Sequence, residues 1–135
     1  MVYLGSKARI SKYIVPILQN EINKYNAVFY DAFVGGANII QHIDAREKVG
    51  IDIHKYLIAL LQYLSKNDIK IDTFSEQEYI KVKQAKEKYP EWYVGLVGFC
   101  GGYGGKVFNG FARSNDNKGF KRDMPRERLL NLKKQ

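Results

Sequence analysis

Apolar positions in the first half of the chain alternate between helical and strand spacing. Residues 7–25 have one apolar helical face, within which Pro16 predicts a kink or a break. A buried strand, a short helix, a second strand and an amphipathic helix are then expected at 27–33, 37–43, 48–53 and 54–66. This alternation of helices and strands predicts an α/β fold with a parallel sheet and right-handed crossovers.

The pattern changes character near residue 70. A charged helix, a helix or buried segment, an irregular glycine-rich segment and a last helix are expected at 75–90, 91–99, 100–119 and 124–135. Ser75 followed by Glu78 is a capping-box signature for the first of these. We therefore expect an α/β part over residues 1–70 and a helical part over residues 71–135.

Composition narrows the class of protein. Hydrophobic residues make up 45% of the 135 residues, which is enough for a core, and the apolar runs are too short to span a bilayer. The single cysteine, Cys100, excludes an intramolecular disulfide and suits a reducing compartment. The charged N-terminus lacks the apolar segment of a secretory signal, so we expect a cytoplasmic protein.

The net charge of +8 indicates a polyanionic partner, because a basic excess is the usual electrostatic footprint of nucleic-acid binding. Cations are concentrated toward the C-terminus, at Lys106, Arg113, Lys118, Lys121, Arg122, Arg126, Arg128, Lys133 and Lys134. Residues 103–113 mix basic and aromatic side chains, and Lys106 and Arg113 are the candidates for contacts with DNA phosphates. A basic surface that is merely solvated is the alternative.

The stretch YDAFVGGANII, residues 30–40, predicts a ligand site. Gly35 and Gly36 follow the first strand, where glycine permits a tight turn and the close approach of a ligand. Asp31 precedes them, and Asp52 ends the next strand 17 positions after Gly35. An acid at about that separation accepts the ribose hydroxyls of nucleotide-type ligands. A tight turn with exposed acids is the alternative.

Three blocks resemble the D12 class of DNA adenine-N6 methyltransferases, the family of Dam-type enzymes. YLGSKARI (3–10) looks like the family's N-terminal motif, YDAFVGGANII (30–40) is similar to the block around S-adenosylmethionine, and GIDIHKYLIALL (50–61) is similar to the block that follows. The segment GFCGGYGGKVFNGFAR (98–113) also resembles the family. The blocks occur in the family's order, and the resemblance covers nearly the whole chain.

This resemblance implies a partial Rossmann-like S-adenosylmethionine-dependent methyltransferase fold with an added helical subdomain. It also implies adenine-specific DNA methylation of the restriction-modification type, with S-adenosylmethionine as cofactor and duplex DNA as partner. Lys7 would bind the donor's carboxylate and Asp52 its ribose hydroxyls, while His54 stands where the family usually has Asn. The residues that would bind the cofactor are Tyr3, Gly5, Lys7, Asp31, Phe33, Gly35, Gly36, Asn38, Asp52 and Ile53.

The family's catalytic tetrapeptide [DNS]-P-P-[YFW] is absent from these 135 residues, because Pro16, Pro90 and Pro125 are all separated. In the family this motif accepts hydrogen bonds from the adenine amine and stacks on the flipped base. No catalytic residue is therefore assigned, and we expect a truncated or split enzyme that transfers no methyl group alone. An incomplete sheet would leave an exposed edge, which a second chain or a homo-oligomer would cover.

Other chemistry has weaker support. His42 and His54 lack partners at metal-ligand spacing, so no metal site is expected. Cys100 has no nearby histidine, which favours an inert thiol. Two alternative functions stay open: a non-catalytic DNA- or partner-binding module derived from the methyltransferase fold, and an unrelated nucleotide-binding α/β domain.

Overall fold

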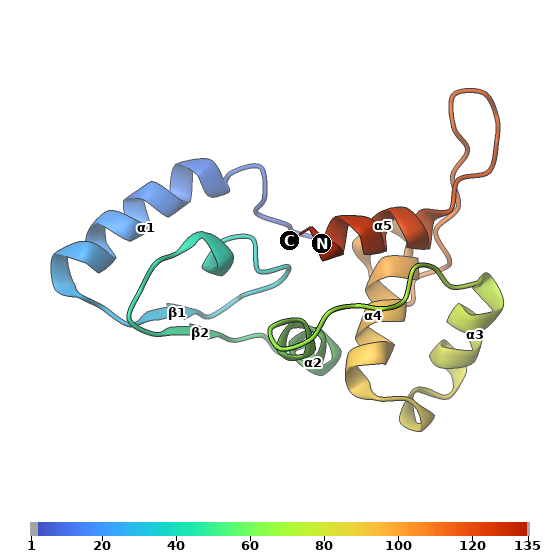
Figure 1. Ribbon diagram of the computed structural model, residues 1–135, viewed down its shortest axis with the longest axis horizontal. Coiled ribbons are helices and arrows are strands. Elements are labelled where there is room, and N and C mark those ends of the chain that lie inside the picture. The colour runs from blue at the N-terminus through green and yellow to red at the C-terminus, as the bar shows by residue number, and fades with distance from the viewer. Residues whose placement is uncertain (1–2, 135) are drawn as a thin grey trace. The chain divides into compact units, whose positions relative to one another are not determined.

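A computed structural model describes residues 3–134 and divides the chain into two compact units (Figure 1). The strand unit is Gly5–His54, and the helical unit consists of residues 3–4 and 55–134. Among the described residues, no helix is both long and apolar enough to cross a membrane.

The strand unit contains a short parallel sheet beside one long helix. Its elements are α1 (Ser11–Tyr25), β1 (Phe29–Asp31), the 3-10 helix η1 (Ile40–His42) and β2 (Lys48–Gly50). β1 and β2 pair in parallel, with Tyr30 opposite Val49. Ile22 of α1 is buried against Ile39 and Ile43, which form the centre of a small apolar core. The prediction of an α/β fold with parallel strands is confirmed at this level.

A kink or a break was predicted at Pro16. Helix α1 is continuous through this residue, so the break is wrong, and the kink stays a prediction. Proline removes one backbone donor and tends to kink a helix, but a helix can pass through it when its apolar face packs well. Here Ile14, Val15 and Leu18 all pack against the core of the strand unit. Packing of this face therefore outweighs the local cost of the proline.

The helical unit is built around one buried helix. Its elements are α2 (Lys55–Leu64), α3 (Glu76–Gln84), η2 (Lys86–Lys88), α4 (Glu91–Gly101), η3 (Tyr103–Gly105) and α5 (Met124–Lys133). Helices α2, α3 and α5 all pack on α4, in which every residue from 94 to 101 is buried. The Ser75 hydroxyl accepts a hydrogen bond from the Glu78 N–H at 3.1 Å, which confirms the predicted cap of α3.

The boundary between the two compact units follows His54, whereas the composition of the sequence changes only near residue 70. The reason is that α2 makes its main contacts with α4. Leu57 and Leu60 of α2 and Val94 of α4 are fully buried in the same core. The assignment of residues 1–70 to donor binding and of 71–135 to target recognition concerns function and stays a prediction.

Arg128 of α5 caps the C-terminal end of α4. Its guanidinium donates hydrogen bonds to the carbonyl oxygens of Cys100 and Gly102, at 3.2 and 2.5 Å. The last carbonyl groups of a helix lack partners within it, and a cation there also offsets the negative end of the helix dipole. Partial burial lowers the pKa of Arg128. Arg128, one of the cations of the basic C-terminal segment, therefore stabilises the end of α4.

Alkaline pH is expected to destabilise the helical unit. Burial raises the pKa of Cys100 to about 12, and burial together with the hydrogen bond to Glu78 raises the pKa of Tyr93 to about 12. Unfolding returns both groups to ordinary values of 9.0 and 10.0, so the unfolded chain loses these protons first. Stability is complete below pH 9 and falls between pH 9 and 12, by up to about 1.4 kcal/mol per pH unit through the buried Cys100 and by less through the more exposed Tyr93.

Urea unfolding at pH 8, 9.5 and 11 measures this slope. Tyr93→Phe removes one of the two ionising groups while keeping the ring, so the variant should lose stability less steeply with pH than the wild type. Equal slopes for both proteins would contradict the assignment to Tyr93.

Candidate functional site

The strand unit brings two of the matching sequence blocks together at the glycine turn, residues 34–37. The Lys7 ammonium donates a hydrogen bond to the Phe33 carbonyl oxygen at 3.3 Å. The side-chain amide of Asn38, which is buried, donates to the Ser6 hydroxyl at 3.0 Å. Segment 5–8 is thereby attached to both ends of the turn.

Asp52 connects the third block to the same turn. Its carboxylate accepts the Gly35 N–H at 3.1 Å and the His54 N–H at 3.0 Å, one on each oxygen. A carboxylate has about four acceptor positions, so about two remain for a ligand. Asp52 therefore fixes the glycine turn and can still accept two hydroxyl groups.

The backbone of the turn has an unusual conformation. Gly35 has φ +48°, and Ala37 has φ +61° although it carries a Cβ. Non-glycine residues with positive φ are uncommon, and such strain is concentrated at functional sites. The turn is held by hydrogen bonds from the Val34 N–H to the Ile51 carbonyl and from the Ala37 N–H to the Val34 carbonyl, both 2.9 Å. The turn is therefore anchored at Val34 and at Ala37, and it includes two residues with positive φ, Gly35 and Ala37.

Further predicted residues line the carboxyl edge of the sheet. Because β1 and β2 are parallel neighbours, the residues that follow Asp31 and Gly50 leave the sheet at the same edge. Asp31 accepts the Phe33 N–H at 3.3 Å, which closes a short turn. The Phe33 side chain is 78% exposed and that of Ile53 is fully exposed, so both can contact a ligand.

Tyr3 belongs to the other compact unit. Its ring packs against Phe99, with 5.6 Å between the ring centroids. The Leu4 N–H donates to the Gly105 carbonyl at 3.4 Å in the same unit. Gly5, with φ +82°, is the first residue of the strand unit, and an added Cβ there would meet no atom within 4 Å. Glycine is required at this position for its conformation, and the donor-binding role of Tyr3 stays a prediction.

Two contributors were missed by the sequence interpretation. Ser6 lies inside the motif YLGSK but was not assigned a role, although it accepts the hydrogen bond from Asn38. His54 contributes its backbone N–H to Asp52. A hydroxyl residue between Gly5 and Lys7 was the available signal for Ser6, whereas a main-chain contribution leaves no trace in the residue type.

The proposed DNA contacts have different surroundings. Lys106 is exposed, and Arg113 forms an ion pair with Glu76. Arg122 forms an ion pair with Glu127, and Lys133 forms one with Asp72. Arg128 donates to carbonyl groups at the end of α4. Several cations of the basic C-terminal segment therefore already have partners within the protein. Phe108 is buried in the core.

The described residues contain no cluster of three or more His, Cys, Asp or Glu side chains that could hold a metal ion. Cys100 is a free, buried thiol. Its raised pKa, which burial causes, keeps it protonated at neutral pH, so it is a poor nucleophile.

Comparison with protein-family models gives a match over most of the chain. A family model described as D12 class N6 adenine-specific DNA methyltransferase matches residues 3–129. No curated protein and no solved structure shows significant similarity to the chain.

Proposed function

Because the chain belongs to the D12 class of N6 adenine-specific DNA methyltransferases, we propose that its strand unit binds the methyl donor S-adenosylmethionine. The observation that carries this proposal is the attachment of the glycine turn to Lys7 on one side and to Asp52 on the other. The strand unit then corresponds to the donor-binding start of a Rossmann-like methyltransferase fold.

The polar groups of the turn suit the donor's two ends. Lys7 uses one N–H on the Phe33 carbonyl, which leaves two to bind the donor's carboxylate. The two free acceptor positions of Asp52 suit the two ribose hydroxyls. Asp31 supplies negative charge for the sulfonium, and the exposed Phe33 and Ile53 offer apolar surface to the adenine. Bound in this way, S-adenosylmethionine supplies an electrophilic methyl group.

Duplex DNA is the proposed substrate, and the helical unit is the proposed region of target recognition. The net charge of +8 favours attraction to DNA, and Lys106 is an exposed cation in the irregular segment after α4. Arg113 is exposed and can exchange its half-buried partner Glu76 for a phosphate at small cost, because ion pairs near the surface contribute about 1 kcal/mol.

Methyl transfer needs groups that these 135 residues do not supply. A polar side chain and a proline carbonyl activate the adenine amine in the family that the chain resembles, and no Pro-Pro sequence is present here. We therefore propose a donor- and DNA-binding role for the 135 residues, with no methyl transfer by them alone. Cytoplasmic location and the covering of the sheet edge by a second chain or a second copy stay predictions.

Calorimetric titration with S-adenosylmethionine and its demethylated product is expected to show binding to one site per chain. Incubation with labelled donor and duplex DNA should leave adenine unlabelled. Absence of binding to both donor forms would overturn the proposal. DNA binding without donor binding would instead select the non-catalytic module, and binding of a nicotinamide dinucleotide would select an unrelated nucleotide-binding domain.

A further inference from the structure

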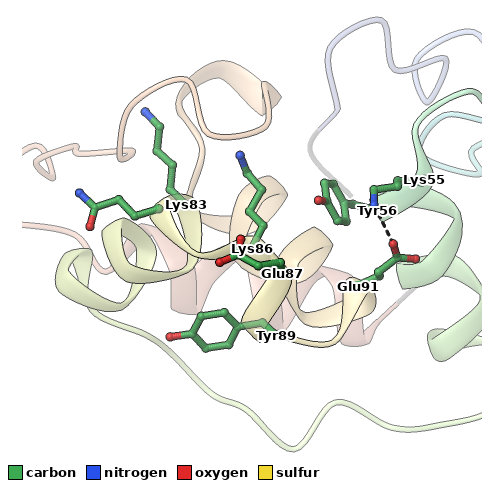
Figure 2. Close-up of a pocket in the computed structure, with 8 residues that line it drawn as sticks. Lys55, Tyr56, Lys83, Lys86, Glu87, Tyr89 and Glu91 are labelled. Carbon is green, nitrogen blue, oxygen red and sulfur yellow. Dashed lines mark hydrogen bonds and ion pairs between the residues drawn. The ribbon is translucent and has the colours of Figure 1, made fainter.

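The helical unit contains an open pocket with a basic lining. The pocket has a volume of about 520 Å³ and is lined from α2, from the end of α3, from η2 and from the start of α4 (Figure 2). Three of its residues are lysines: Lys55, Lys83 and Lys86. Tyr56 and Tyr89 also line it, with Gln84, Glu87 and Glu91. We call this site the α3 lysine pocket.

Of the three lysines, only Lys55 has a carboxylate partner among the described residues. The Lys55 ammonium lies 2.8 Å from the Glu91 carboxylate, and Figure 2 shows this pair at one side of the pocket. Within the described residues, Lys83 and Lys86 form no ion pair with any carboxylate, and in Figure 2 their side chains extend in the same direction. Glu87 is the one remaining acid of the lining.

Lys86 is positioned without being neutralised. Its Nζ lies 5.2 Å from the centroid of the Phe108 ring, and that ring is buried in the core of the helical unit. A cation–π contact orients an ammonium group but leaves its hydrogen-bond donors available. Lys83 lies one turn earlier, at the end of α3. The pocket thus combines a cation held by an aromatic ring with a second cation three residues away.

We propose that the α3 lysine pocket binds phosphate groups of the backbone of duplex DNA. This inference rests on the proposed function, in which DNA is the substrate. Ammonium groups are typical donors to phosphate oxygens, and these contacts position a protein on the duplex without reading its sequence. The site is an addition to Lys106 and Arg113, and Lys83 and Lys86 need not first leave a carboxylate partner.

Salt-dependent DNA binding tests the inference. Anisotropy of a fluorescein-labelled duplex of about 20 base pairs is measured between 50 and 200 mM NaCl, and log K is plotted against log salt concentration. The variant Lys83→Gln/Lys86→Gln should reduce the magnitude of the slope by about 2, because each lost phosphate contact removes about 1. Lys83→Gln alone, which leaves the Phe108 contact in place, should reduce it by about 1.

Lys81→Gln/Lys88→Gln is the matched control, since it removes two charges from the same helical segments at positions that do not line the pocket. Its slope should stay near that of the wild type. Glu87→Gln removes the remaining acid and should strengthen binding. Equal slopes for the pocket variants and the wild type, equal losses in pocket and control variants, or no DNA binding by the wild type would each overturn the inference.

Donor titration of the same proteins separates this inference from the proposed function. The pocket variants should bind S-adenosylmethionine as the wild type does, because neither lysine belongs to the strand unit. Donor binding with no pocket effect on the DNA slope would reject the pocket and keep the donor site. A pocket effect on the slope without donor binding would keep the pocket and reject the donor site.

Discussion

Asp52→Ala is expected to weaken the binding of S-adenosylmethionine strongly. The change removes two proposed charge-assisted hydrogen bonds to the ribose, each of which contributes about 1.5–3 kcal/mol. It also frees the N–H groups of Gly35 and His54, which the carboxylate now holds at 3.1 and 3.0 Å. Affinity should therefore fall by at least about 100-fold, as measured by calorimetry.

Asp44→Asn is the matched control for this change. Asp44 is an exposed acid of the same unit, and its hydrogen bonds with Gln19 use only its main-chain atoms. Its variant should keep wild-type donor affinity. Asp52→Asn retains one acceptor oxygen and should show an intermediate loss if the fold is intact by circular dichroism. Wild-type affinity in a folded Asp52→Ala protein would reject Asp52 as a donor ligand.

Gly95→Ala is expected to destabilise the helical unit strongly. A Cβ at this position of α4 would lie 2.2 Å from the Tyr56 carbonyl oxygen, which belongs to the backbone of α2. The two helices would have to separate by on the order of 1 Å, which opens the core around Leu60. Overpacking of this kind costs about 3 kcal/mol, whereas alanine recovers only about 1 kcal/mol of helix propensity. The midpoint of thermal unfolding should fall by about 10 °C.

Gly98→Ala is the comparison within the same helix. The atoms nearest to its added Cβ are side-chain atoms of Phe108 and Val107, both at 2.9 Å, and side chains can rotate where a helix backbone cannot. This variant should lose clearly less stability in the same circular-dichroism melt. If Gly95→Ala is as stable as Gly98→Ala, the close approach of α2 to α4 is not the constraint that the structure indicates.

Local patterns in the sequence were sufficient to predict most elements. Ser75 and Glu78 indicated the start of α3 because a capping box depends on residues three positions apart. Apolar spacing indicated α2, and Leu57 and Leu60 are fully buried. The expected break at Pro16 was wrong, because the helix is held by packing that the local sequence does not reveal.

The candidate site divides in the same way. The residue types of the site could be predicted from the sequence, because a tight turn favours glycine and a nucleotide-type ligand favours an acid at the end of a strand. Ser6, the His54 N–H and the left-handed Ala37 were not predicted, since they depend on where distant backbone atoms meet. The sequence also could not show that Arg113 pairs with Glu76, whereas Lys83 and Lys86 form no ion pair with any carboxylate of the described residues.

By itself, the sequence determined the order of helices and strands, the family and the residue types available for a donor and for DNA. Those properties follow from spacing along the chain and from side-chain chemistry. Only the tertiary structure decided that the boundary between the two compact units follows His54 and that the Asp52 carboxylate holds the glycine turn. It also decided that Lys83 and Lys86 line one pocket without a carboxylate partner among the described residues. These outcomes depend on contacts between residues far apart in sequence, and such contacts are set by packing and by competition for hydrogen-bond partners.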